Sequence, residues 1–484
     1  MKNPASIIFF ALSLVLAGCA VGPNYHPAAA LPNKPTPKAF TEPSAGTNQV
    51  AWKIAEPSAN LPRGDWWQLF QDEELNGLET LALTNNQNLV AAGARFEEAR
   101  ALLAETRSEF YPQLTLGGTP GGDINRQRTS VNEPENGVAA GASKTYNTFT
   151  APLYLGWEID LWGRVRRESQ AAHARFTASA DDWESAKLDV AAEVADNYFA
   201  LRTLDVEYNV VTNTIETFRR SLELTQNRRR GGIASDLDVS QAATALHDAE
   251  AQQPDILLRR AQALHALAIL CGQSPVDFNV IVDVSNNLIV PEVPVDLPSE
   301  LLEHRPDIAA AERRMAAANA DVGVADAAFF PTIRINGLAG FQSVDASSWF
   351  NWSSRLWSVG PSIELPIFTG GLNRANLAGA RAAYDETVAD YRQTVLSAFG
   401  EVEDELAAQR LLADEGAADS EAVTSSQRTL EIANNRYKDG LITYLDVATA
   451  ETDALNEERN AVELQGARLT AAVNLIKALG CGWQ

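Results

Sequence analysis

The 484-residue sequence predicts a mainly α-helical protein with additional membrane-type β-strands, built from two copies of one repeat. Three observations predict this class. Short motifs recur in the same order in the two halves of the chain. Segments of both halves alternate between apolar and polar residues, as half-exposed strands do. Two long segments carry apolar residues at steps of three and four without a break, as packed helices do.

Composition and charge exclude several classes of function. The net charge is -24, with 63 acidic and 39 basic residues, whereas a nucleic-acid partner requires a basic surface. The five His and two Met do not cluster and no CxxC pair occurs, so no metal site is predicted. Cys19, Cys271 and Cys481 are odd in number and widely spaced, which implies no disulfide framework.

The N-terminus is typical of a lipoprotein signal peptide over residues 1–18. The apolar run Ile7–Leu16 is too short to span a bilayer as a helix. It leads into Leu16-Ala17-Gly18-Cys19, which resembles a bacterial lipobox, so Cys19 is expected to become the lipidated first residue. Ala20 at the next position favours the outer membrane by the same resemblance. The alternative is an ordinary signal peptide with an incidental cysteine. Residues 19–65, rich in Pro, Ala and Asn, are predicted to form an extended, lipidated tether.

Four landmarks define the repeats, which are predicted at residues 66–290 and 291–484. Each copy is expected to run helix, strand, loop, strand, long helix, turn, helix. The landmarks of the first copy lie at 109–114, 156–161, 232–239 and 270–272, and those of the second at 328–333, 360–365, 440–447 and 478–480. Coincidence would not keep four landmarks in order, so the pattern indicates an internal duplication.

The predicted strands carry one apolar face each. The alternating segments are 148–161, 333–341 and 357–367, with a short Gly-rich strand near Leu114 and Leu116. Two interpretations remain open: a half-buried sheet on a soluble core, or a barrel with a lipid face and a wet lumen. No other segment is apolar enough for a membrane helix, so a crossing would require a barrel. Four strands cannot close one, since about eight is the minimum, so membrane strands would require several chains.

The long helices are predicted from apolar stripes that run from Trp183 to Leu222 and from Tyr384 to Leu406. No Gly or Pro interrupts residues 168–230, and about sixty helical residues span roughly 90 Å. Such a helix must pack along its length against other helices. Pro254 is expected to kink or interrupt the return helix of the first repeat.

Polar, Gly/Ser/Asn-rich residues 119–147 and 343–355 are predicted to form exposed loops between strands. The second of these contains Trp349, Phe350 and Trp352. Two interpretations remain open for this trio: an aromatic girdle at the bilayer surface, or a small local cluster.

The stretch from Cys19 to Tyr25 (CAVGPNY) resembles the mature N-terminus of outer-membrane efflux lipoproteins, the TolC-like or NodT-like channels. Residues 66–70 (WWQLF), 305–308 (RPDI) and 401–404 (EVED) resemble further landmarks of that family. The resemblance implies a homotrimer in the outer membrane of a Gram-negative bacterium. Its twelve-stranded β-barrel, with four strands per chain, would stand on a long periplasmic α-helical barrel.

The same resemblance implies a passive conduit for small toxic compounds and no enzyme. Its partners would be a periplasmic adaptor (membrane fusion) protein, an inner-membrane transporter, commonly of the resistance-nodulation-division type, and outer-membrane lipid. No cofactor is expected beyond the covalent lipid on Cys19, a diacylglycerol and an N-acyl chain. The exported compound stays open among drugs, metal ions, solvents and siderophores.

The two predicted helix tips contain Ser235-x-x-Asp238 and Thr443-x-x-Asp446, both of which fit a capping box that starts a helix. By resemblance the tips form the periplasmic mouth, where three copies of Asp446 would bind cations and repel one another. Leu445 and Tyr444 are the candidate constriction residues. Whether Asp446 faces the pore or only caps its helix stays open.

Gly232 and Gly440 are expected to allow tight turns and, by resemblance, close approach of the adaptor. The candidate adaptor contacts are Gly232, Ser235, Asp238, Gly440, Thr443, Arg228 and Arg436. Arginines are also favourable at a helix C-terminus on their own. The mid-helix carboxylates Glu401, Glu403, Asp404 and Glu405 lack a nucleophile or His, so a solvated face or pore lining is favoured over catalysis.

Two alternatives to an efflux channel remain. A lipid-anchored periplasmic coiled-coil scaffold or adaptor would explain the lipobox and the helices but not the strands. A channel for type I protein secretion would share the whole architecture.

Overall fold

The computed structural model describes residues 20–31, 64–118, 123–128, 143–284, 289–291, 293 and 304–480. The signal peptide, Cys19, most of the expected tether and Cys481 lie outside them. The chain divides into two compact units. The first takes its described residues from Met1–Ala28, Glu97–Ala178 and Glu312–Ala389, and the second from Ala29–Phe96, Ser179–Ala311 and Asp390–Gln484. Each unit therefore combines segments of both repeats.

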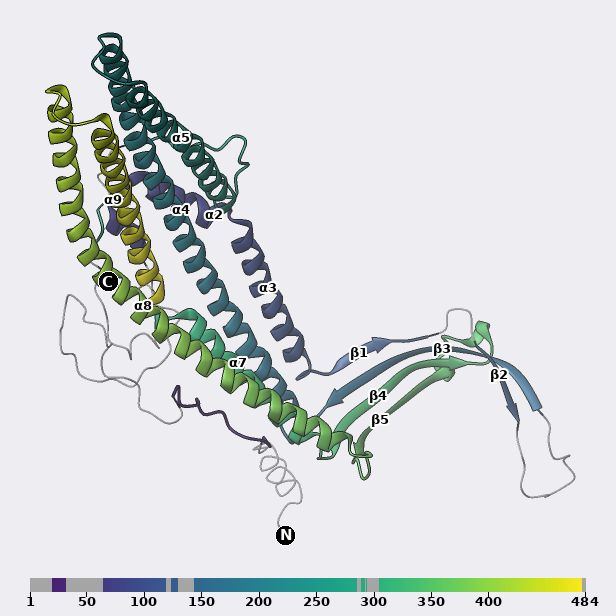
Figure 1. The fold of residues 1–484 in the computed structure, drawn as a ribbon. Coiled ribbons are helices and arrows are strands. Elements are labelled where there is room, and N and C mark those ends of the chain that lie inside the picture. Colours follow the sequence, from purple (N-terminus) through teal and green to yellow (C-terminus); the bar gives the residue numbers. More distant parts are fainter. Residues whose placement is uncertain are drawn as a thin grey trace, which may run out of the picture. The chain divides into compact units, whose positions relative to one another are not determined.

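The helices occur in pairs of equal length, as an internal duplication requires (Figure 1). Helices α3 and α7 have 22 residues each, α4 and α8 have 67 each, and α5 and α9 have 35 each. At 1.5 Å per residue, 67 residues extend about 100 Å. The bounds are η1 Trp66–Phe70, α2 Glu73–Asn85, α3 Gln87–Ser108, α4 Arg164–Arg230, α5 Asp236–Leu270, α7 Pro306–Ala327, α8 Leu372–Lys438 and α9 Tyr444–Ala478. Among the helices described, none is long and apolar enough to cross a membrane.

Helix α5 runs through Pro254 without a break, so of the expected kink or interruption the interruption is wrong and the kink stays a prediction. Proline removes one backbone hydrogen bond and crowds the preceding turn. Ala249 and Ile256, on either side of it, are both buried against α4. Packing on both sides holds the segment helical despite the local cost.

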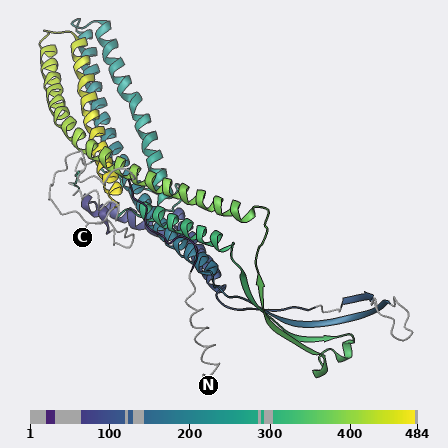
Figure 2. The same cartoon turned by 90° about the horizontal axis from the view of Figure 1, so that it is seen from below.

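The strands form one antiparallel sheet in the order β1-β3-β4-β5. Their bounds are β1 Gln113–Leu116, β2 Asp123–Arg128, β3 Ser143–Glu158, β4 Thr332–Ser343 and β5 Arg355–Glu364. Figures 1 and 2 show them side by side as a curved ribbon. β2 pairs with the first six residues of β3, beyond the end of β4. Part of the loop expected at 119–147 is therefore a hairpin, because the β-prone Thr145, Tyr146 and Thr148 extend β3 backwards.

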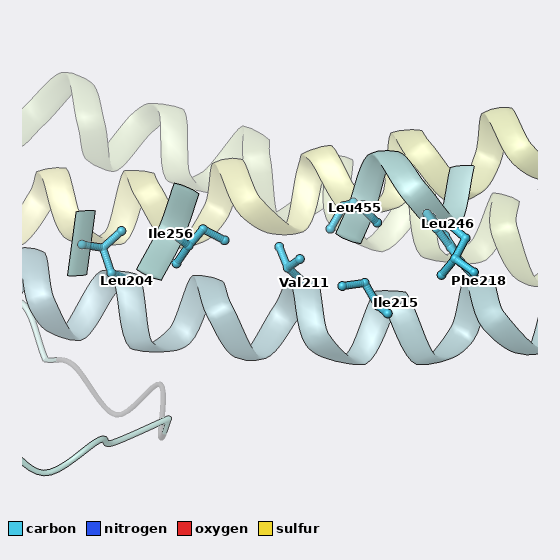
Figure 3. Packing of buried hydrophobic residues seen from close by; sticks show 8 residues of the cluster. Leu204, Val211, Ile215, Phe218, Leu246, Ile256 and Leu455 are labelled. Carbon is cyan, nitrogen blue, oxygen red and sulfur yellow. The ribbon is translucent and has the colours of Figure 1, made fainter. Parts of the chain in front are cut away.

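The core of the second unit lies between α4, α5 and α9 (Figure 3). Leu204, Val211, Ile215 and Phe218 of α4 follow the expected apolar stripe and are buried. The cluster also contains Leu246, Ala249 and Ile256 of α5 and Leu455 of α9. A second cluster, nearer the tips, joins Ala242 to Ala433, Tyr437, Tyr444, Val447 and Ala450. The two helical hairpins are thus packed as one bundle.

Candidate functional site

The two helix tips are built in the same way. Gly232 and Gly440 both have φ of +76°, a left-handed conformation that glycine adopts without steric cost. At the first tip the Gly232 N–H donates to the Arg229 carbonyl at 2.9 Å, and at the second the Gly440 N–H donates to the Tyr437 carbonyl at 2.9 Å. These bonds satisfy carbonyls that the ending helices leave free. The turn-forming role expected of both glycines is seen in the structure.

Both capping boxes also form. Asp238 Oδ2 accepts hydrogen bonds from the Ser235 N–H at 2.7 Å and its hydroxyl at 2.8 Å. Asp446 Oδ2 accepts from the Thr443 N–H at 3.1 Å and its hydroxyl at 2.9 Å. The capping role is therefore confirmed for both aspartates. The Asp446 side chain is also exposed, so the predicted gate role remains compatible with its place at the tip.

Tyr444 does not fit the predicted constriction. Its side chain is 1% exposed, its hydroxyl donates to Glu451 Oε2 at 2.9 Å, and its ring meets Tyr437 edge-on at 5.5 Å. A side chain buried inside its own subunit cannot line an opening in this conformation, so that prediction is wrong for Tyr444. Leu445, one residue on, is 55% exposed and keeps the role as a prediction.

A buried polar network beneath the tips was missed by the sequence reasoning. Glu451 is 1% exposed, and it accepts a second hydrogen bond, from the Ser221 hydroxyl of α4 at 2.6 Å. Burial raises the pKa of Glu451, while the two hydroxyl donors act in the opposite direction. The available signal was a carboxylate inside an apolar stripe, since Val447, Ala450 and Ala454 flank Glu451 on the same helical face.

Arg228 forms a second set of polar contacts between the tips, in addition to the hydrogen bonds of Glu451. Its Nη1 donates to the carbonyls of Tyr437 at 2.8 Å and Lys438 at 3.2 Å, and its guanidinium lies 4.5 Å from the centre of the Tyr437 ring. The side chain is half-buried and links the end of α4 to the end of α8. Arg228 is therefore engaged within its own chain, whereas the other candidate, Arg436, is exposed.

A third set of polar contacts between the two hairpins lies further along the bundle. The Glu207 carboxylate of α4, whose side chain is 1% exposed, accepts from Arg259 of α5 at 3.1 Å and from Arg459 Nε of α9 at 2.9 Å. One buried carboxylate thus serves both hairpins. If α9 moved away, Glu207 would keep Arg259, so the buried charge would not be left alone.

Of the mid-helix carboxylates, Glu401 is bound by a cation, whereas Glu405 lies near other carboxylates. Glu401 forms an ion pair with Arg305 Nη1 at 2.5 Å, and Arg305 also binds Asp307 at 2.6 Å. Burial, with the nearby carboxylates Asp196, Asp404 and Glu401, raises the pKa of Glu405 to about 7. The ion pair with Arg305 gives the EVED and RPDI motifs a structural role in one place.

The sheet of the first unit has one apolar and one polar face, as the alternation predicts. Cross-strand partners share a face, so the register sorts the side chains. The apolar face contains Leu114, Leu116, Leu153, Leu155, Trp157, Ile333, Ile335, Trp357, Val359 and Ile363. Six of these ten side chains are exposed, Trp357 to 74% and Ile363 to 69%, and the other four are half-buried. The other face contains Thr115, Glu158, Arg334, Asn336 and Ser358.

The aromatic trio between β4 and β5 is divided. Trp349 stacks on Phe350 at 4.8 Å and also meets Phe149 at 5.5 Å, so the local cluster is confirmed for these rings. Trp352 is exposed, with the Arg355 guanidinium 3.9 Å from its ring centre. Trp352 and the exposed Phe350 remain available for the bilayer surface.

Comparison with known proteins decides the family. The model of the outer membrane efflux protein family matches residues 78–273 and 297–481, which are most of both repeats. The chain belongs to the outer membrane efflux protein family. The recognised resemblance is thereby confirmed.

Its relatives match over nearly their full length. It is 34% identical to the toluene efflux pump outer membrane protein TtgF of Pseudomonas putida over 98% of this chain and 96% of that protein. It is 30% identical to the cation efflux system protein CusC of Escherichia coli O6:H1 over all of both chains. The solved outer-membrane channel OprN superposes with a TM-score of 0.83 and 30% identity, over 96% of this chain and 100% of that one.

The membership establishes the function in outline. The chain is the outer-membrane component of an efflux pump, with the fold of the trimeric outer-membrane channels. It resides in the outer membrane of a Gram-negative cell and extends into the periplasm. The predicted fold class, function and location are confirmed at this level.

Proposed function

We propose that three copies of this chain form a passive conduit whose four strands per chain close a twelve-stranded barrel. The apolar sheet face carries this proposal, because a four-stranded sheet leaves Trp357, Val359 and Ile363 exposed in a single chain. Strand β4 has 12 residues, which at about 3.4 Å each and a 45° tilt cover about 29 Å, close to the thickness of a hydrocarbon core. The polar face would line the lumen.

The proposed conduit has no catalytic role. Its partners are a periplasmic adaptor protein and an inner-membrane transporter of the resistance-nodulation-division type, which supply the choice of substrate and the energy. Exposed Ile233 and Leu237 at one tip and Leu441 and Leu445 at the other provide apolar surface for the adaptor. The anchor is a diacylglycerol and an N-acyl chain on Cys19.

The proposed cargo is a small toxic compound. One relative is named for toluene efflux and another for cation efflux, at 34% and 30% identity. A wide conduit behind a selective transporter accommodates both. The two kinds of cargo can be distinguished in a strain that lacks its own channels, by expressing this channel with a solvent pump and, separately, with a cation pump. The pump with which the strain regains resistance identifies the cargo, solvent or cation. Secretion of a type I protein substrate instead of either resistance would favour the secretion alternative.

The conduit is tested by cross-linking and single-channel recording on the purified protein. We expect a trimer and a pore that conducts in planar bilayers. A stable, non-conducting monomer in mild detergent would refute the proposal and favour a periplasmic scaffold.

The gate proposal has a matched control within the chain. Asp446 and Asp238 both lie at the third position of equivalent helices and accept from the N–H and hydroxyl of the N-cap residue. Asn keeps an acceptor oxygen but removes the charge near the helix N-terminus, so Asp446→Asn and Asp238→Asn should cost similar stability, about 0.5 kcal/mol each. If Asp446 also guards the opening, only Asp446→Asn changes ion selectivity and antibiotic uptake. Equal recordings from the two variants would reduce Asp446 to a helix cap.

A further inference from the structure

A groove between α3 and α4 of the first unit differs in charge from the chain as a whole. It has a volume of about 540 Å³, which is within the range of ligand sites. Its lining combines apolar and basic side chains, among them Leu103, Tyr111, Phe176, Arg100, Arg107 and His173. None of the residues that line it is acidic, although the chain carries a net charge of -24. The groove therefore suits a ligand that is both apolar and anionic.

The two arginines lie on the face of α3 that packs on α4. Arg100 and Arg107 stand three residues before and four residues after the buried Leu103, so all three share one helix face. Arg100 has a loose ion pair, with 3.5 Å between its Nη1 and Glu97 Oε2, and such exposed pairs contribute little. Arg107 forms no ion pair with any residue that the structure describes. A cation in the last turn stabilises a helix on its own, but this does not account for Arg100, two turns earlier.

The groove opens on the side of α4 that faces away from the polar face of the sheet. Arg164, at the start of α4, donates to Glu158 Oε1 at 2.8 Å, and Glu158 belongs to that polar face. His173 comes nine residues after Arg164, which at about 100° per residue places it on the opposite side of the helix. Because the polar face lines the lumen in the proposed barrel, the groove opens on the outer side of the wall.

The groove also lies at the end of the two helices that is nearest to the sheet (Figure 1). Arg107 is the last residue but one of α3, and Tyr111 lies between α3 and the start of β1. Leu114, on the apolar sheet face, follows Arg107 by only seven residues. In the proposed barrel, the headgroups of the adjacent leaflet therefore lie beside Arg107 and Tyr111, where arginine and tyrosine side chains are favourable.

The second repeat shows what the equivalent helix face can bind. Helix α7 begins and ends 219 residues after α3, so Asn319 corresponds to Arg100 and Asp326 to Arg107. Asn319 Nδ2 donates to the Pro23 carbonyl at 3.3 Å, and a Cβ added at Gly22 would lie 3.6 Å from Asp326 Oδ2. Residues 20–25, expected to be part of an extended tether, are thus docked in a groove beside α7. No described segment covers the matching face of α3, which is left open to a separate molecule.

We propose that the α3–α4 groove binds an anionic phospholipid, taken from the membrane leaflet that borders this end of the sheet. The phosphate pairs with Arg100 and Arg107, because guanidinium groups bind phosphate oxygens through charge-assisted hydrogen bonds. The first part of an acyl chain packs on Leu103 and Phe176. An ammonium headgroup finds no carboxylate in the lining, so phosphatidylglycerol fits better than phosphatidylethanolamine. The inference rests on the proposed membrane barrel, which supplies the leaflet.

The test is native mass spectrometry of the full-length protein in a mild detergent, titrated with phosphatidylglycerol or phosphatidylethanolamine of equal chain length. We expect one phosphatidylglycerol per chain, bound about tenfold more tightly than phosphatidylethanolamine. Arg107→Gln should weaken phosphatidylglycerol binding about fivefold, the contribution of one basic residue beside an anionic lipid. Arg95→Gln removes the same charge from an exposed position of α3 outside the groove and should bind as the wild type does. Equal binding of the two lipids, or equal phosphatidylglycerol binding by the two variants, would overturn the proposal.

Two further variants test the apolar part and the occupant. Ala104→Trp fills the groove from an exposed position without changing any charge, and should also lower phosphatidylglycerol binding. Cys19→Ser, exported with an ordinary signal peptide, should bind phosphatidylglycerol as the wild type does. Binding seen only in Cys19→Ser would assign the groove to the chain's own acyl chains and overturn the proposal.

Failure of this inference is distinguishable from failure of the proposed conduit. The same samples are examined for trimer mass and for conductance in planar bilayers. A conducting trimer without a preference for phosphatidylglycerol would refute the lipid site and leave the conduit intact. A monomer would refute the conduit, whereas its lipid preference could still be measured, because all residues that line the groove belong to one chain.

Discussion

Glu79 of α2 should make the protein less stable as the pH rises. It is 0% exposed, and neither carboxyl oxygen has a hydrogen-bond partner within the part of the chain that the structure describes. Burial raises the pKa of Glu79 to about 9 from an ordinary value of 4.5. Between these two values the folded chain keeps a proton that the unfolded chain has released. The free energy of unfolding therefore falls with rising pH across that interval.

The magnitude follows from the interval. Each pH unit costs about 1.4 kcal/mol, so the step from pH 5.5 to 8.5 costs about 4 kcal/mol. For a chain of 484 residues the unfolding entropy is about 1 kcal/mol/K, which converts this cost to roughly 4 °C in Tm. Glu79→Gln cannot ionise. Its Tm minus that of the wild type should therefore rise by about 4 °C between the two pH values.

The assay is thermal unfolding followed by circular dichroism at 222 nm in one detergent at both pH values. The unpaired amide of Gln carries its own cost, but that cost is the same at each pH and cancels in the comparison. Glu73→Gln, an exposed carboxylate on the same helix, is the control and should show no such rise. A Tm difference for Glu79→Gln that does not change with pH would refute the reasoning.

Two other predictions concern the bundle and the sheet. Arg459→Ala removes the bond between α9 and Glu207 but leaves Glu207 paired with Arg259, so it should cost only about 1–3 kcal/mol of stability and increase channel conductance. Arg259→Ala keeps the α9 contact and should keep the wild-type conductance. Equal conductance in the two variants would contradict this prediction. Gly340→Val should abolish trimer yield on a gel, because an added Cβ would lie 2.3 Å from the Ala151 carbonyl, whereas Gly360→Ala, with open space around it, should assemble normally.

Features set by short-range chemistry could be predicted from the sequence. The capping boxes and tip glycines are local devices, since each bond joins residues within a few positions of one another. The alternation of β3, β4 and β5 fixed their two faces before any partner was known. The duplication then gave the order of elements in both halves.

Features set by contacts between distant residues could not be predicted from the sequence. Tyr444 and Leu445 are neighbours at one helix start, and only the packing of α9 against Tyr437 decides that Tyr444 turns inward. The docking of residues 20–25 depends on Arg167 and Asn319, more than 140 and 290 positions away. A segment rich in Pro and Ala reads as an extended tether until such a groove is seen.

Corresponding helices of the two repeats have equal lengths, but the residues that form their polar contacts with α4 differ. Helix α9 begins 208 residues after α5, which makes Ala243 the counterpart of Glu451 and Ala251 the counterpart of Arg459. Ala243 and Ala251 cannot make the hydrogen bonds that Glu451 and Arg459 make to α4. Helix α5 instead binds α4 through other positions, among them Arg259, which shares Glu207 with Arg459. The two return helices therefore hold α4 through polar contacts at different positions, so a substitution on α9 can weaken one hairpin contact without weakening the other.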